Sequence, residues 1–421
     1  MGNRVKWMKK KTLLRLLVLL GFAFPVTVIL LHVFLRCYFI AEERREVRRT
    51  WAQLKTSGFV CSGREMAARH PAAEPAEAAA FMTLLRQTAD LNSKWSGKAA
   101  VQSPETRAEL DALMAAWQPY LAAERLPLVS DFRQGPAQLP WPELSGCENF
   151  SSLLLRLARQ CSAAGRSCEL PEIWRQHNRL VRLVAGYPFL DSVAHARRLD
   201  LAAATLLSPL VVSAGRGDVP DEALRQLAAE RQDVEMALFQ AFVRGLQEEA
   251  YGLENGCWRE QYCQGLSYRN EADWNRLVHR YARVLEDLYR ETVNNCNGTL
   301  WPSIYLPPPL LERRSTLLEY ARAMVHFRAV NRGIRYWLAL ECFRRRHGRL
   351  PVQLDELVPE FLAELPEDPY SGRPFGYRFP AGTVFSIGYD RIAADGAGDD
   401  LVFPLTTAAG GKEAGEGEPE Q

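Results

Sequence analysis

The sequence predicts a mostly α-helical protein with three structured parts: an N-terminal transmembrane helix, an all-α helical domain, and a C-terminal α+β module that combines a long helix with a small antiparallel sheet. A charge-free run at 16–35 predicts the first part. Apolar residues at three- and four-residue spacing predict helices through 71–300. Short runs at 375–379, 383–388 and 401–405, between Gly- and Pro-rich turns, predict the three strands of the sheet. A net charge of +2 gives no basic surplus of the kind that binds nucleic acid.

The run Leu16–Leu35 is long enough to cross a bilayer, because about 20 helical residues span the hydrocarbon core. Pro25 lies inside it, and proline is tolerated in membrane helices. A cleavable signal peptide is the alternative interpretation. Its apolar core would be about 7–15 residues long and would end at a small-x-small site, but Arg36 follows the run without such a site. The sequence therefore favours an uncleaved anchor at 13–40.

The basic residues that flank this run decide the predicted orientation. Lys9, Lys10 and Lys11 precede it without an intervening acid, and arginines also follow it. Because a first helix usually keeps its more basic flank inside, we expect 1–12 to be cytoplasmic and the body to lie outside.

The rest of the chain divides at changes in composition. Residues 41–70 form a predicted connector, 71–300 the helical domain, 310–405 the C-terminal module, and 406–421 a Gly- and Glu-rich tail that we expect to be disordered. Ser103 before Pro104 is a typical helix start. Further helices are predicted at 148–164, 170–185, 189–208, 220–255, 271–295 and 310–347, with a short helix at 351–362.

The chain has nine cysteines, and their pairing would depend on whether the compartment is oxidising. Cys161 and Cys168 form one close pair, and Cys257 and Cys263 form another. In an oxidising compartment each pair would form a disulfide. The alternatives are buried free thiols or a zinc site, although the chain has no Cys-x-x-Cys motif. The disulfides are the favoured interpretation.

The most specific motifs lie near the C-terminus. A long predicted helix ends at a GRLP turn, Gly348 to Pro351, and LDELVP follows from Leu354 to Pro359. DPYSGRPFGY then runs from Asp368 to Tyr377, and SIGYD from Ser386 to Asp390. In this order the motifs resemble the soluble domain of type II secretion major pseudopilins, and the C-terminal module of many bacterial membrane-anchored proteins related to that fold. A bacterial inner-membrane protein with its body in the periplasm is what the resemblance implies, in or beside secretion or envelope machinery.

The resemblance also implies a calcium ion, because the acidic loop of these pseudopilins binds calcium. Asp390, Asp395, Asp399 and Asp400 are the predicted ligands here, and carboxylates are the ligands that calcium prefers. Arg391 replaces the family's small or polar residues and could neutralise an aspartate instead, so a solvated loop is the alternative. The anchor also lacks the glutamate of a processed pilin, and the module lies far from it in sequence. We therefore do not expect a pilus subunit.

The sequence shows no recognised catalytic motif. Its seven histidines are scattered; His195 has Asp191 four residues earlier, and His177 lies between Arg175 and Arg179. The favoured hypothesis is a non-enzymatic, single-pass membrane protein whose helical domain and pilin-like cap bind protein partners in the envelope. The alternative is an extracytoplasmic enzyme with an unrecognised site in the helical domain.

Overall fold

A computed structural model describes most of the chain between residues 27 and 405. The described ranges are 27–95 without 36, 40, 43, 44, 46, 47, 50, 57 and 61, then 104–123, 126–127, 142–214, 219–254, 308–392 and 398–405. The protein is mostly helical with small antiparallel sheets at the C-terminal end, as the sequence predicts. The predicted helix at 271–295 and the predicted tail at 406–421 lie outside the described residues.

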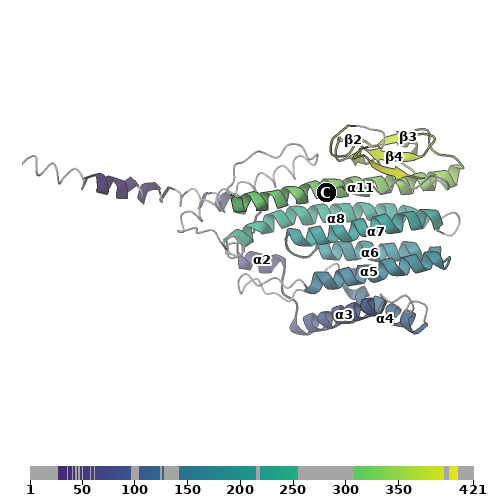
Figure 1. Ribbon diagram of the computed structural model, residues 1–421, viewed down its shortest axis with the longest axis horizontal. Helices are drawn as coiled ribbons and strands as arrows, with labels where there is room; N and C mark the ends of the chain where they lie inside the picture. Colours follow the sequence, from purple (N-terminus) through teal and green to yellow (C-terminus); the bar gives the residue numbers. More distant parts are fainter. Residues whose placement is uncertain are drawn as a thin grey trace, which may run out of the picture.

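Long helices stacked side by side form the body (Figure 1). Its helices are α3 (Pro75–Lys94), α4 (Pro104–Ala123), α5 (Pro142–Ala163), α6 (Leu170–Ala185), α7 (Phe189–Ala214), α8 (Asp221–Glu254) and α11 (Pro308–His347). Helices α5 to α8 pack against one another, α3 and α4 lie on the α5 side, and α11 lies on the α8 side. Pro104 does begin α4, as predicted, but α5 begins earlier than expected and α7 ends later.

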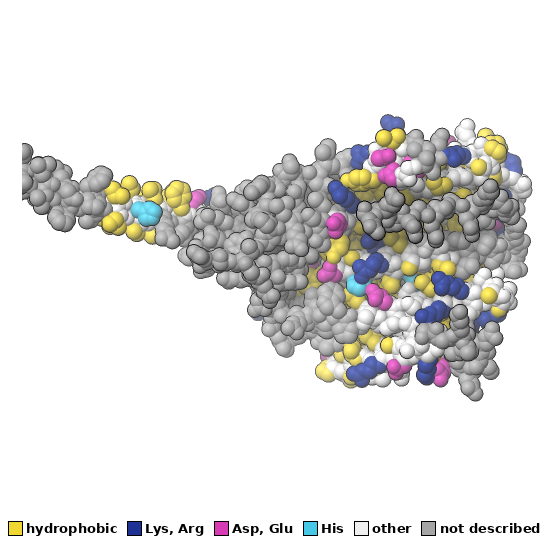
Figure 2. Space-filling view, viewed as in Figure 1, with side chains coloured by type: hydrophobic (Ala, Val, Ile, Leu, Met, Phe, Trp, Pro, Cys, Tyr) yellow, Lys and Arg dark blue, Asp and Glu magenta, His cyan; other side chains and the backbone are white. Residues whose placement is uncertain are grey.

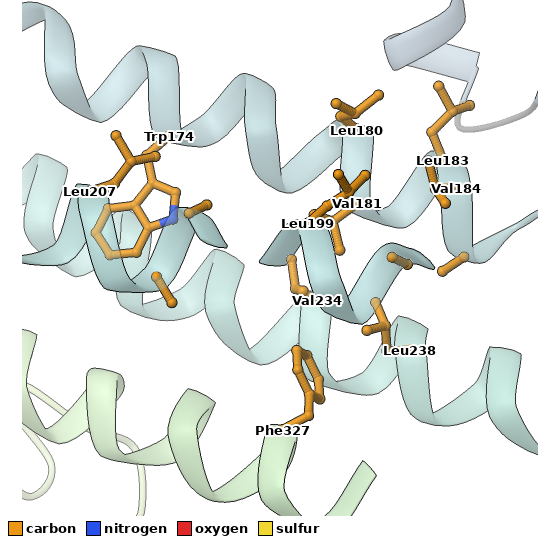
Figure 3. Packing of buried hydrophobic residues seen from close by; sticks show 14 of the residues in the cluster. Trp174, Leu180, Val181, Leu183, Val184, Leu199, Leu207, Val234, Leu238 and Phe327 are labelled. Carbon is orange, nitrogen blue, oxygen red and sulfur yellow. The ribbon is translucent and has the colours of Figure 1, made fainter. Parts of the chain in front are cut away.

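One continuous hydrophobic core runs through these layers. Figure 3 shows Phe327 of α11 pointing toward Val234 and Leu238 of α8. At the far side, the ring of Trp117 on α4 stacks on Phe150 of α5 with centroids 4.5 Å apart. Because the core continues without a break from α4 to α11, each helix depends on its neighbours for burial of its apolar face.

Helix α11 carries the C-terminal module on the side that faces away from α8 (Figure 1). Strands β3 (Gly376–Arg378), β4 (Thr383–Ser386) and β5 (Leu401–Pro404) form an antiparallel sheet in that order. Gly333 on α11 lets the Phe403 ring approach the helix, since a Cβ at that position would lie 2.2 Å from the ring. Trp337 Nε1 also donates to Pro404 O at 2.9 Å.

The module differs from the sequence prediction in two respects. The short helix expected at 351–362 is only a 3₁₀ turn, Leu354–Leu357, and Glu356 Oε1 accepts from Gln353 N, just before the turn, at 3.2 Å. A second antiparallel pair, β1 (Glu367–Asp368) with β2 (Arg373–Pro374), was not expected. The turn between these strands contains Gly372 at φ +68°, a conformation that glycine adopts without strain. Strands of two residues give no alternating pattern, so the sequence could not reveal them.

The N-terminal region begins with a helix at 27–35 that continues at 37–39. In the predicted connector, α2 (Gly63–Arg69) begins at Ser62, whose Oγ accepts from Glu65 N at 3.3 Å. Among the described residues no helix is both long and apolar enough to span a membrane. The predicted anchor at 13–40 falls in large part on residues before 27, outside the described chain.

Candidate functional site

A layer of polar side chains lies inside the bundle where α5, α6, α7 and α8 meet. It consists of Ser151 on α5, His177 and Asn178 on α6, Asp200 on α7 and Arg231 on α8. Each of the five is at most 2% exposed. Burying charged groups costs several kcal/mol unless they are paired, so the geometry of this layer matters for folding and for any chemistry.

Arg231 and Asp200 form the charged centre of the layer. The guanidinium meets the carboxylate with two parallel hydrogen bonds, of which Nη2 to Oδ2 is 2.7 Å. Nη1 also donates to Asn178 Oδ1 at 3.1 Å, and the guanidinium lies 5.9 Å from the centre of the Trp174 ring. This bidentate geometry gives both carboxylate oxygens a hydrogen-bond donor and fixes the register of α7 relative to α8.

Ser151 and His177 form a hydrogen-bonded pair beside this centre, with Oγ and Nε2 2.8 Å apart. Burial, opposed by Asp200 and reinforced by the Arg231 charge, lowers the pKa of His177 to about 4. The imidazole is therefore neutral at pH 7. Among the described residues its Nδ1 has no hydrogen-bond partner, so no carboxylate orients the ring as in a Ser-His-Asp triad.

A chain of polar groups leads outward from the layer along α6 and α8. Asn178 Nδ2 donates to Glu230 Oε2 at 3.4 Å, and Glu230 Oε1 accepts from Arg175 Nε at 2.8 Å. The hydrogen bond to Glu230 is the main cause of a raised Arg175 pKa. The network thus joins the buried centre to the partly exposed flank of the bundle.

A second buried carboxylate, Glu248 on α8, holds the connector against the body. Its Oε1 lies 2.6 Å from His70 Nε2, and its Oε2 accepts from Phe189 N at 3.0 Å. Phe189 has φ +67°, an uncommon conformation for a residue with a side chain. Arg69 donates to Gly58 O at 2.7 Å on the same side. These contacts tie the end of the predicted connector to α7 and α8.

A third cluster joins α8 to α11. Arg328 Nε and Arg332 Nε both donate to Glu235 Oε1, at 3.0 Å and 2.9 Å. Arg332 Nη1 also donates to Glu367 O at 2.6 Å, so the same residue reaches the C-terminal module. The three contacts make α11 a shared element of the bundle and the sheet.

A shallow groove lies between α3 and α4, with a volume of about 370 Å³. Leu91 and Leu113 line it together with Asp90, and Lys94 and Glu109 form an ion pair at 3.5 Å beside it. Among the described residues, these two acids and one base do not form a nucleophile–base pair or a metal cluster.

The acidic loop predicted to hold calcium is described only in part. Asp399 Oδ2 accepts from Tyr389 N at 2.7 Å and from Asp390 N at 3.0 Å, and the bond from Asp390 N is the main cause of a lowered Asp399 pKa. Asp390 Oδ1 accepts from Ile392 N at 2.8 Å. Asp400 lies beside them, whereas Asp395 falls outside the described residues. Within the described ranges, no three acidic, His or Cys side chains are grouped to hold a metal ion. Calcium binding stays a prediction.

The described pair of cysteines does not form the expected bond. Both are free thiols: Cys161 is buried on α5, with Sγ 3.4 Å from Glu169 Oε2, and Cys168 is exposed on the turn that follows. Burial, together with Glu169, raises the pKa of Cys161. Because the two side chains point into different environments, a bond would require one of them to turn. Cys257 and Cys263 lie outside the described residues, and their disulfide stays a prediction.

His195 and His177 have hydrogen-bond partners other than Asp191 and the two arginines that neighbour His177 in the sequence. His195 Nδ1 contacts Glu148 Oε1 on α5 at 2.7 Å, while Asp191 accepts from Tyr320 Oη on α11 at 2.6 Å. His177 faces the core rather than the arginines beside it. The polar layer as a whole was missed by sequence reasoning. The available signal was a polar residue at an apolar position of each stripe, such as Asp200, which lies four residues after Ala196 and three before Ala203.

No protein-family model, curated protein or solved structure matches this chain. The resemblance of the C-terminal module to pseudopilins therefore stays a prediction from its motifs.

Proposed function

We propose that the protein is a non-enzymatic, single-pass membrane protein, and that its helical body and C-terminal cap bind protein partners outside the cytoplasm, beside secretion or envelope machinery. The observation that carries the proposal is the helix at 27–39. Nine of its large apolar side chains are between 41% and 65% exposed, and Figure 2 shows apolar side chains along the narrow N-terminal segment, on the face in view. Exposure of this kind costs free energy in water and is removed in a bilayer.

The distribution of these side chains around the helix favours lipid over a protein groove. Val28, Ile29, Leu30 and Leu31 are consecutive, so they point in four directions about 100° apart. A helix that docks on a protein needs one apolar stripe, whereas a helix surrounded by lipid needs apolar residues on every side. The cluster around Glu248, which fixes the connector to α7 and α8, would then hold the body at a defined place relative to the membrane.

A topology experiment tests this proposal. Alkaline phosphatase fused after Gln421 of the full chain should be active in a bacterial host, and the chain should stay in the membrane after alkaline carbonate extraction. The same fusion without 13–40 should be soluble and inactive. An inactive full-length fusion, together with an active cytoplasmic reporter at the same point, would overturn the orientation. Release by carbonate would overturn the anchor.

The Ser151–His177 contact is the observation that favours the alternative, an extracytoplasmic enzyme. A substrate would have to enter the bundle, because both residues are buried. A fluorophosphonate probe on the full chain separates the two functions. Labelling that disappears in Ser151→Ala but persists in Ser152→Ala would support the enzyme, and its absence under conditions that label a serine hydrolase control favours the binding protein.

A further inference from the structure

Three arginines of α11 meet a single carboxylate in the seam between α8 and α11. They are spaced by four and three residues, at 328, 332 and 335, so they lie on one face of the helix. Arg328 Nε and Arg332 Nε both donate to Glu235 Oε1, at 3.0 Å and 2.9 Å. Arg335 Nη2 donates instead to Gln232 Oε1, at 2.8 Å. Because Gln232 precedes Glu235 by one turn of α8, the three guanidinium groups lie next to one another along that helix.

Arg335 is a buried cation that lacks a carboxylate partner. The residue is only 8% exposed, and its acceptor among the described residues is the neutral amide of Gln232. No described carboxylate lies within salt-bridge distance of it, and its Nε has no hydrogen-bond partner. Burial lowers the pKa of Arg335, Glu235 opposes this effect, and Arg332 lowers the pKa further. The guanidinium has therefore lost water without gaining the negative charge that would compensate for it.

The amide of Asn331 is a second buried group without a partner in this seam. It lies three residues after Arg328 and four before Arg335, so it occupies the same face of α11. Asn331 is 0% exposed, and neither its Nδ2 nor its Oδ1 has a hydrogen-bond partner among the described residues. Buried polar groups in proteins are nearly always hydrogen-bonded. The seam therefore contains N–H donors, on Arg335 and Asn331, that the described protein does not use.

The other end of α11 carries an arginine cluster that is balanced by acids. Arg344 and Arg345 share Glu341, and Asp221 Oδ1 accepts from Arg345 Nη1 at 3.1 Å. The Arg345 side chain is only 16% exposed, and it has two carboxylates. The comparison distinguishes a self-contained network of ion pairs from the seam at Arg335, where one cation lacks a carboxylate.

Solvent can reach the Arg335 end of the seam. Gln232 is exposed on α8, and Met236, one turn later, is 48% exposed. The Arg332 side chain is 17% exposed. A charged acceptor makes a stronger hydrogen bond to a guanidinium than a neutral amide does, so an anion from solvent can displace Gln232 from Arg335.

We propose that Arg332, Arg335 and Asn331 form a binding site for a dianionic oxyanion such as sulfate or phosphate. The arginines at 328, 332 and 335 and the carboxylate of Glu235 together carry two more positive than negative charges, which a dianion neutralises. A guanidinium offers paired N–H donors to two oxygens of such an anion, and the Asn331 amide offers a further donor.

The exposed residue Gln232 provides the first test, because Gln232→Glu supplies the missing carboxylate from the protein itself. Sulfate binding to the full chain in detergent is measured by calorimetric titration with sodium sulfate, at an ionic strength held constant with sodium chloride. We expect saturable binding that weakens at least tenfold in Gln232→Glu. It should weaken less than threefold in Gln240→Glu, the same charge change at another exposed position of α8. Absence of saturable binding to the wild type, or equal loss in both variants, would overturn the proposal.

Arg335→Gln tests the cation directly, with Arg345→Gln as the matched control. Both variants remove a guanidinium that α11 packs against α8, so both should unfold at a lower urea concentration than the wild type. Only Arg335→Gln should also lose sulfate affinity, by at least tenfold, whereas Arg345→Gln should change it less than threefold. If Arg335→Gln does not fold, the comparison of Gln232→Glu with Gln240→Glu decides alone. Sulfate binding by Arg335→Gln with wild-type affinity would show that the anion binds elsewhere and would exclude this site.

Discussion

The buried Arg231–Asp200 pair allows a quantitative test of how the bundle is held together. We consider Arg231→Met, which keeps most of the side-chain volume but leaves the Asp200 carboxylate in the core without its cation. Asp200→Asn is the reciprocal change, and the double variant removes both charges. Arg198→Met on α7 is the control, because Arg198 is exposed.

The structure sets the expected magnitude. Both side chains are fully buried and the carboxylate accepts two hydrogen bonds from the guanidinium. Two unit charges about 4 Å apart attract by about 4 kcal/mol at the effective dielectric constant that suits such sites. Removing one member of a buried pair costs about 3–5 kcal/mol, because the other charge stays desolvated. We expect Arg231→Met to lower the free energy of unfolding by this amount, and the control to change it by less than about 0.5 kcal/mol.

The assay is urea unfolding of the full chain in detergent, followed by tryptophan fluorescence, since Trp174 lies against Arg231. If the cost of each single variant is an unpaired charge, the double variant should be more stable than the sum of the two losses by about 2–3 kcal/mol. Additive losses would refute the reasoning, because they would mean that packing volume and not charge pairing determines the stability of this layer.

Three further outcomes follow from other contacts. The pKa of His177 lies at about 4 in the folded chain and near 6.5 in an unfolded one, so only the unfolded chain takes up this proton between those pH values. The free energy of unfolding should therefore fall by about 3 kcal/mol from pH 7 to 4 through this group. In His177→Gln, urea unfolding should show a free energy of unfolding that depends less steeply on pH. Asp368 is buried and accepts from Tyr370 N, Ser386 Oγ and Ile387 N, so Asp368→Ala should cost about 2–4 kcal/mol and increase hydrogen exchange in β4, whereas the exposed Asp355→Ala should not. Maleimide should label Cys168 in the folded protein and Cys161 only after unfolding; failure of both to react until a reductant is added would instead support their disulfide.

Features set by local chemistry could be predicted from the sequence. Gly348, at φ +68°, ends α11 where the glycine and the following proline indicated a stop. The three strands of the larger sheet lie within the expected ranges, because Val384 and Phe385 are β-formers bounded by turn residues. Each of these features depends on residues that are close together in the sequence, so the sequence pattern is sufficient to predict it.

The polar layer could not be predicted because its members come singly from different helices. Ser151 and His177 are separated by 26 positions, and Asp200 and Arg231 by 31. No spacing rule connects such residues until the helices are packed together. Asp368 was missed for a related reason: the sequence shows it only as the first residue of DPYSGRPFGY, whereas its bond to Ser386 depends on the fold of the module.

Glu235 obtains its two arginines only from residues that are 93 and 97 positions later in the chain. At about 5–20 residues per second, a ribosome needs roughly 5–20 s to make that stretch. During this interval the buried face of α8 has been synthesised but lacks its cover, so the nascent protein carries a carboxylate and apolar residues that only its last quarter can shield. Chains that stall before α11 should therefore bind chaperones or be degraded. Synthesis of α11 determines when the body can fold with these groups buried.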